Sequence, residues 1–169
     1  DTGCGELFGP STGKLLPTGN VIDPVTTEDG ATYEVSVVDA GIPTVFIEAQ
    51  ALGMTGIETP AQIEGDAELM EKIEEIRGRC AQKMGFTADY KLARKDSPYA
   101  PFFAIVSPCR DYRTFDGKDV KGADIDIVSR LLFMQKMHKT HPVTGTVCMS
   151  TAARIPGSFH SAATPVARA

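Results

Sequence analysis

The sequence predicts an α+β fold in which a curled sheet of mixed or antiparallel strands surrounds one central helix. Three patterns lead to this expectation. Residues 33–39 and 44–49 are short apolar runs, rich in valine, that are typical of neighbouring strands. Residues 67–84 carry apolar side chains at a helical spacing. Residues 147–155 are small or apolar on nearly every face, which predicts a helix that is buried on all sides.

The length and composition are those of one ordinary soluble domain. The chain has 169 residues, of which 42% are hydrophobic and 23% are charged, so it holds enough apolar side chain for a core. Its formal net charge is −5. Because nucleic acids and anionic membranes need a basic face, we expect neither as a partner. No run of about 18 apolar residues predicts a membrane span.

The cysteines indicate a reducing compartment. Cys4, Cys80, Cys109 and Cys148 are far apart, and none forms a C-x-x-C pair. An even number is compatible with two disulfides, but a domain of this size does not need them, and no signal peptide is recognisable. We therefore expect four reduced thiols in a cytoplasmic protein.

The first elements are expected to be strands. Residues 14–17 read as a short strand that ends in the turn at 18–20. Residues 33–39 and 44–49 are separated by the Gly-Ile-Pro turn at 41–43, so they are expected to form a hairpin or an adjacent pair.

Two helices and a buried strand follow. A helical turn is expected at 60–63, and the long helix over 67–84 is expected to end at Gly85. Residues 102–107 form a continuous apolar run that predicts a buried strand, and 108–122 are expected to form a polar loop.

The remaining elements are predicted to be helical. A second helix is expected over residues 124–137, with a wide apolar stripe. Thr144-Gly145-Thr146 leads into the last helix, over 147–155, which is stopped by Pro156 and Gly157.

Two motifs are interpreted as structural. Gly9–Lys14 has three residues between its glycines and Leu15 after its lysine, whereas a phosphate loop needs four residues and a Ser or Thr. His138 and His141 lack an evident third ligand, so no metal site is predicted.

Thr144, Gly145 and Thr146 are a candidate grip for a carboxylate. The first N–H groups of a helix have no intrahelical partner, and together with the helix dipole they attract an anion. Gly145 would let a ligand approach the backbone closely. The alternative is a plain N-cap by Thr144 or Thr146, and the residues alone do not separate the two interpretations.

Cys148 is a weaker candidate for a catalytic group. Counted from Thr144, it lies in the first helical turn, where a thiol has a lowered pKa and can act as an acid or base. We favour the alternative that Cys148 is a small buried hydrophobic residue, because helices of small residues often contain cysteine.

Five segments in this order resemble one known family: 12–20, 37–43, 123–126, 143–148 and 152–157. Together they resemble the PrpF-type methylaconitate isomerases, which include methylitaconate isomerase and oxalomesaconate tautomerase. The resemblance implies a diaminopimelate epimerase-like fold of two similar halves, each a curled sheet around a central helix, with the substrate between them.

The resemblance also implies that residues 1–169 are a single lobe. They correspond to most of the second half of the family's sequence. The first half, with the proposed catalytic Lys and Cys, would precede Asp1, and the final strands would follow Gly157. We therefore expect an excised or partial chain that is inactive alone, and its open strand edges favour association with a second copy.

The implied activity is a proton shift that needs no cofactor. Its substrate would be a small unsaturated di- or tricarboxylate such as 2-methylaconitate, in propionate metabolism. The resemblance implies that the substrate is bound by Thr144, Gly145 and Thr146, with a second polar loop of Thr18, Gly19 and Asn20. Ile42 departs from the wider fold group, which commonly has Asn before the proline.

Two other functions remain open at this point. The chain is compatible with a non-catalytic accessory or binding module of the same fold. A more remote alternative is a thiol-dependent enzyme that uses Cys148.

Overall fold

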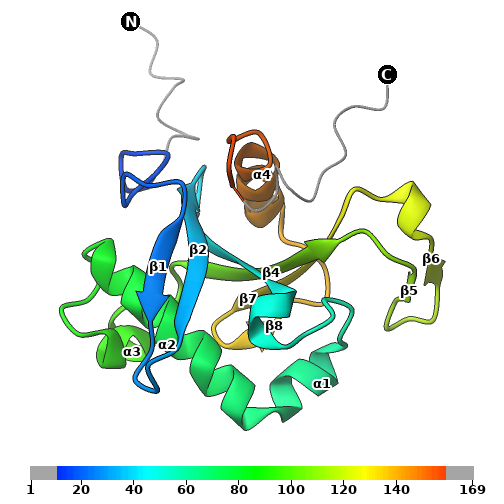
Figure 1. Ribbon diagram of the computed structural model, residues 1–169, viewed down its shortest axis with the longest axis horizontal. Helices are drawn as coiled ribbons and strands as arrows, with labels where there is room; N and C mark the ends of the chain where they lie inside the picture. Colours follow the sequence, from blue (N-terminus) through cyan, green and yellow to red (C-terminus); the bar gives the residue numbers. More distant parts are fainter. Residues whose placement is uncertain (1–10, 159–169) are drawn as a thin grey trace, which may run out of the picture.

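The computed structural model describes residues 11–158, which form one mixed sheet with helices on both of its faces (Figure 1). The sheet has six strands in the order β1-β2-β3-β4-β7-β8. The strands are β1 (Asp23–Thr26), β2 (Thr32–Asp39), β3 (Pro43–Glu48), β4 (Phe102–Pro108), β7 (Ile127–Phe133) and β8 (Lys136–Met137). The predicted α+β class with a mixed sheet is confirmed, and the sheet is open rather than closed.

All neighbouring strands of this sheet are antiparallel except β3 and β4, which are parallel. Parallel neighbours require a long crossover between them. The crossover contains η1 (Ala49–Leu52), α1 (Pro60–Gly65), α2 (Ala67–Lys83), η2 (Tyr90–Leu92) and α3 (Ala93–Asp96). These helices lie on one face of the sheet, and α4 (Val143–Ala152) lies on the other (Figure 1).

Local signals fix where the crossover helices begin and end. Thr59 and Gln62 form a reciprocal capping box at the start of α1. The Asp66 carboxylate accepts a hydrogen bond from the Leu69 N–H at the start of α2. Gly85 follows the end of α2 with a φ of +79°, which confirms the predicted stop.

The larger core lies between the sheet and α2. Alternate strand side chains face α2, and Ile73, Ile76 and Cys80 of the helix pack on them. The buried strand residues of this cluster are Val25, Tyr33, Val35, Val37, Val45, Ile47, Phe103, Ile105 and Leu132.

A smaller core joins the sheet to α4. It contains Cys148 and Ala152 of the helix, and Val38, Phe46, Ala104 and Val106 of the sheet. The prediction that this helix is buried on all sides is wrong for the described residues: Val143 is 80% exposed and Val147 is 49% exposed. The physical reason is that the open sheet covers only one face of the helix.

The strands predicted at 33–39, 44–49 and 102–107 are confirmed as β2, β3 and β4, and the helix at 67–84 as α2. The helical turn at 60–63 is the start of α1.

The helix predicted over 124–137 is wrong, because this segment forms the hairpin of β7 and β8. Its turn places Met134 and Gln135 at φ values of 49° and 60°. Both central residues of a primed hairpin turn need a positive φ, which a helix does not allow. The chain between β4 and β7 is also more ordered than a loop, since it contains η3 (Gly122–Asp124) and a second hairpin of β5 (Tyr112–Arg113) and β6 (Asp119–Val120).

The strand predicted at 14–17 is wrong, since these residues form bends and a turn. Leu15 still accepts a hydrogen bond from the Asp39 N–H, so the segment lies against the end of β2.

Cys80, Cys109 and Cys148 are free thiols, while Cys4 and the start of the Gly9–Lys14 segment lie outside the described residues. Among the helices of residues 11–158, none has both the length and the apolar character needed to cross a membrane.

Arg77 joins helix α2 to the segment that leads into β4 through hydrogen bonds. The Arg77 guanidinium forms two hydrogen bonds with the Glu74 carboxylate, at 2.6 and 2.8 Å, and donates to the Ser97 and Ala100 carbonyls at 2.9 and 3.2 Å. Gly78, the next residue of α2, lies directly against η2.

A methyl group at Gly78 would collide with the chain that crosses it. An added Cβ would lie 2.6 Å from the Tyr90 carbonyl oxygen and 3.3 Å from the Ala93 Cβ. We predict that Gly78→Ala lowers the free energy of unfolding by roughly 1–2 kcal/mol, because overpacking outweighs the gain in helix propensity. Urea denaturation followed by circular dichroism measures this change.

The matched control is Gly65→Ala at the end of α1, where an added Cβ meets no atom within 4 Å. This variant should be unchanged or more stable by up to about 1 kcal/mol. Equal destabilisation of both variants would contradict the proposed collision.

Candidate functional site

The first turn of α4 presents backbone N–H groups without a side-chain cap. The helix follows Pro142, whose φ and ψ are −66° and 145°, and no side chain caps its start. The Thr146 N–H is the first to bond backward, to the Pro142 carbonyl at 2.9 Å. The N–H groups of Val143, Thr144 and Gly145 therefore precede the first helical hydrogen bond and point along the axis toward an incoming acceptor.

Gly145 lies against the Leu131 side chain of β7 and against the residues just before α4. An added Cβ would be 2.6 Å from the Leu131 Cδ1, 3.2 Å from the Pro142 Cγ and 3.3 Å from the His141 Cε1. Gly145 is buried, whereas Thr144 and Thr146 are exposed. The structure thus gives Gly145 a packing role, and the expected close approach of a ligand stays a prediction.

His141 connects the start of α4 to β7. Its Nδ1 lies 3.0 Å from the Thr146 Oγ1, and its Nε2 lies 3.3 Å from the Ser129 Oγ. The Thr146 hydroxyl donates its single hydrogen to the Pro142 carbonyl at 3.1 Å. It can therefore accept from the His141 Nδ1–H, and in a neutral ring Nε2 then accepts from the Ser129 hydroxyl.

Burial lowers the pKa of His141 from its ordinary value of 6.5; a hydrogen bond to the Pro142 backbone opposes this, and the nearby His138 lowers it slightly further. A neutral ring suits this position, because a cation is disfavoured at the positive end of a helix dipole. In the sequence, His141 was considered only as a possible metal ligand, and no metal site was predicted. Nothing in the pattern indicated that its side chain bonds to the first turn of α4.

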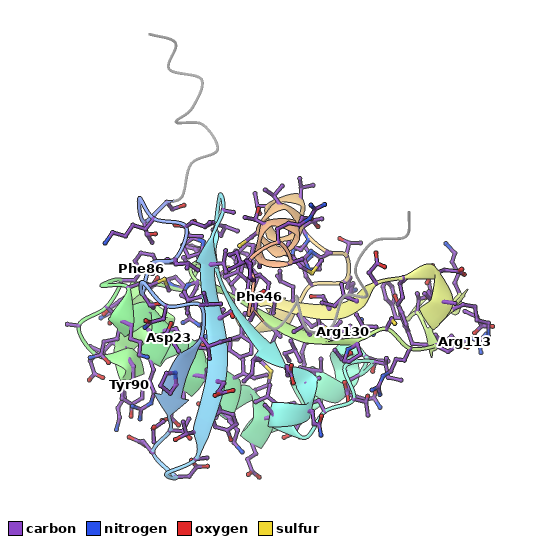
Figure 2. The ribbon with its side chains drawn as sticks, turned by 45° about the horizontal axis from the view of Figure 1, so that its top comes forward. Asp23, Phe46, Phe86, Tyr90, Arg113 and Arg130 are labelled. Carbon is purple, nitrogen blue, oxygen red and sulfur yellow. The ribbon has the colours of Figure 1, made fainter. Side chains whose placement is uncertain are left out.

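The Thr18-Gly19-Asn20 loop holds a buried carboxylate of the protein itself. The Thr18 hydroxyl donates to the Asp23 Oδ2 at 2.6 Å, and the Asn20 Nδ2 donates to the Asp23 Oδ1 at 3.2 Å. Asp23 is only 3% exposed, and it is the first residue of the edge strand β1 (Figure 2). Gly19 has a φ of 82° and closes the turn through a hydrogen bond from its N–H to the Leu16 carbonyl.

The two segments predicted to bind substrate lie at different ends of α4. Val21, next to the Thr18–Asn20 loop, has its Cγ1 3.9 Å from where an added Cβ of Gly157 would lie, just beyond the carboxyl end of the helix. Thr144–Thr146 lie at its amino end. Within residues 11–158 no hydrogen bond joins the two segments.

Cys148 lies in the second turn of α4, because the helix begins at Val143. Its thiol is fully buried and donates to the Val38 carbonyl at 3.3 Å. Burial raises the pKa of Cys148, and the nearby Asp39 carboxylate raises it further. The direction is opposite to that expected for a thiol in the first helical turn, so the structure supports the interpretation as a small buried residue.

The end of β2 is tied to the preceding segment by Asp39. This side chain is fully buried, and its Oδ2 accepts hydrogen bonds from the Thr12 N–H and hydroxyl at 2.6 and 2.8 Å. Within the described residues its Oδ1 has no hydrogen-bond partner. Ile42, in the adjacent turn, packs against the α4 core rather than presenting a polar group.

His138 and His141 are not part of a ligand set in the described residues. Across positions 11–158, no group of three or more His, Cys, Asp or Glu side chains is arranged to hold a metal ion.

The fold matches a solved isomerase. The crystal structure of a methylitaconate-delta-isomerase superposes on the chain with a TM-score of 0.91 and 44% identity, and covers 96% of this chain and 42% of that chain. The architecture is therefore that of a PrpF or diaminopimelate epimerase-like isomerase, as the resemblance implied.

Sequence relatives carry related names. The chain is 47% identical over 155 residues to 3-methylitaconate isomerase of Eubacterium barkeri, which covers 91% of this chain and 40% of the relative. It is 35% identical over 147 residues to 2-methyl-aconitate isomerase of Shewanella oneidensis, which covers 87% and 37%. The family model described as PrpF protein matches residues 6–168, and the chain belongs to this family. It spans about two fifths of the length of these relatives.

The lowered pKa of His141 predicts a pH dependence of stability. The unfolded chain has the ordinary pKa of about 6.5, so it binds more protons than the folded chain just below that pH. His141 therefore favours the folded state above about pH 6.5, and this contribution is lost as the pH falls through the lowered folded pKa. We predict that wild type becomes less stable relative to His141→Gln between pH 7.5 and pH 5, as measured by urea denaturation.

His138→Gln is the matched control, since His138 is exposed and its repulsion is the smallest cause of the shift. Its stability difference from wild type should change much less with pH. A pH-independent difference for His141→Gln would show that the ring is not held neutral by the fold.

Proposed function

We propose that this chain is the carboxylate-binding lobe of an isomerase that moves a proton within a small unsaturated di- or tricarboxylate and uses no cofactor. The relatives named for 3-methylitaconate and 2-methyl-aconitate suggest the substrate class. The observation that carries the proposal is the uncapped first turn of α4, with its N–H groups at Val143, Thr144 and Gly145.

A proton shift next to a carboxylate needs positive potential at that carboxylate. Removal of an allylic proton leaves a carbanion whose charge spreads onto the neighbouring carboxylate oxygens. Fixed N–H groups and a helix dipole stabilise this charge without reorganising during the reaction. The neutral state of His141 leaves the grip to these dipoles, and its bonds to Ser129 and Thr146 hold the first turn in place.

The catalytic acid and base belong, in this proposal, to the part of the relatives' length that this chain does not span. Among the described residues, Cys148 was the sequence-based candidate, and its burial and raised pKa oppose that role. For Thr18, Gly19 and Asn20 we propose a smaller role than the sequence suggested, in which their side chains do not bind the substrate. Because the Thr18 and Asn20 side chains bind Asp23, this loop would act through its fixed backbone.

A cytoplasmic location, which rests on the cysteine pattern, and a place in propionate metabolism, which rests on the family resemblance, complete the proposal.

A chimeric enzyme tests the proposal. The chain would replace its matching segment in the Eubacterium barkeri 3-methylitaconate isomerase, with which it shares 47% identity. We predict that the chimera moves solvent deuterium into 3-methylitaconate, detected by NMR, and that the 169-residue chain alone does not.

Val143→Pro in the chimera tests the grip itself. Pro142 already has the extended backbone that precedes a proline, and Val143 is 80% exposed, so the helix should tolerate the change. The substitution removes one N–H that would bond a charged oxygen, so kcat/KM should fall by about tenfold or more.

Val147→Ala, one turn along the exposed face, is the control and should leave kcat/KM within about twofold, since surface changes are small. A folded Val143→Pro chimera with unchanged kcat/KM would remove the α4 amides from the site. A folded chimera without exchange would instead favour the accessory-module function.

A further inference from the structure

A small pocket lies on the face of the sheet opposite α4, where no function has been assigned. It has a volume of about 260 Å³ and lies between the β5–β6 hairpin, the start of α1 and the edge strand β8. Arg130 of β7 lines its inner side and Arg113 its hairpin side (Figure 2). Strand alternation turns Ser129 and Leu131 toward α4, so Arg130 faces the other way.

Arg130 is a partly buried cation that forms no salt bridge within the described residues. Its Nε donates to the Glu58 carbonyl at 2.9 Å and its Nη1 donates to the Ser129 carbonyl at 3.3 Å. The guanidinium carbon lies 5.2 Å from the centre of the Tyr112 ring. Burial lowers its pKa, which reflects the cost of holding this charge away from water.

The carboxylates that line the pocket are engaged elsewhere. Glu58 accepts hydrogen bonds from the Thr55 N–H, the Thr55 hydroxyl and the Gly56 N–H, at 2.6, 2.7 and 2.8 Å. Asp116 bonds the Thr114 hydroxyl and pairs with Lys118. The Glu58 carboxylate and the Tyr112 side chain offset the burial of the Arg130 charge only in part, since the pKa of Arg130 stays lowered, and no carboxylate of residues 11–158 forms a salt bridge with it. A partly buried cation without a salt bridge favours an anion from outside.

The rest of the lining favours an anion with a flat apolar body. Phe115 lines the pocket and is 62% exposed, and Ile57, Tyr112 and Met137 add further apolar surface. Lys139 stands at the rim as a second cation. The volume is slightly below that of a typical drug site, which fits a ligand about the size of a single ring.

We propose that this pocket binds a small planar carboxylate, with its charge on Arg130 and its apolar body against Phe115 and Tyr112. In this complex the Arg130 guanidinium donates to a carboxylate oxygen, and the two aromatic rings cover the unsaturated or aromatic part. Because the pocket and α4 lie on opposite faces of the sheet, the experiments can disprove this site without disproving carboxylate binding at α4, and the reverse.

Benzoate is the probe, and benzamide and inorganic phosphate are its controls. Each is titrated into the ¹⁵N-labelled 169-residue chain and followed by NMR. We expect saturable shifts at the residues around Arg130 with benzoate, and binding of benzamide that is weaker by about tenfold or more, since a charged hydrogen bond is lost. Phosphate should bind more weakly than benzoate, because it lacks an apolar body.

Arg130→Gln should weaken benzoate binding by about tenfold or more, while Arg113→Gln should leave it within about twofold. Arg113 is the matched control because it lines the same pocket but donates to the Gly117 carbonyl and lies 3.8 Å from the Asp119 carboxylate. Phe115→Ala, at an exposed position that does not endanger folding, should weaken benzoate binding without affecting phosphate.

Equal binding of benzoate and benzamide would overturn the proposal, as would full benzoate affinity in a folded Arg130→Gln variant. Phosphate binding as tight as benzoate, or no effect of Phe115→Ala, would overturn the assignment of a planar apolar ligand.

Discussion

The parallel pairing of β3 with β4 is the constraint on which the rest of the structure depends. Thr44 lies opposite Phe102 and Glu48 opposite Val106, so the chain must leave β3 and return to the same end of the sheet. The return path carries α1 and α2, which fill one face of the sheet. Helix α4 therefore packs on the other face of the sheet, through the small core around Phe46 and Cys148. Its first turn stands over β7, and the Arg130 pocket opens behind the same strand.

The sequence predicted most clearly an element that has one buried face and one solvent-exposed face. Helix α2 has one buried face and one solvated face, so its spacing and Gly85 were sufficient to predict it. Strand β7 is different, because both of its faces are covered: Leu131 packs toward α4 and Leu132 toward α2. A strand covered on both faces loses its alternation, and its apolar run is then indistinguishable from a helical stripe. The small residues of α4 likewise suit a helix covered on one side or on all sides.

The candidate sites were less predictable, since they depend on contacts between distant segments. Helix α4 begins at Val143, so Thr144–Thr146, which were expected to lead into the helix, form its first turn; the free N–H groups of that turn follow from helix geometry. The role of His141 required knowing that Ser129 lies beside it. The sequence suggested that the polar side chains of Thr18 and Asn20 are available to a ligand, but both donate hydrogen bonds to the Asp23 carboxylate. Arg130 gave no signal in the sequence, because its neighbour Glu58 is 72 residues away.

The central claim is that the first-turn amides of α4 bind a carboxylate. The most direct test is to follow the amide signals of Val143, Thr144 and Gly145 by NMR while 3-methylitaconate is added to the chain. These three amides should shift in a saturable way, and the dimethyl ester of the same acid should leave them unmoved, because it carries no charge for the helix dipole to attract. Saturable binding that shifts other amides and leaves these three in place would contradict the claim.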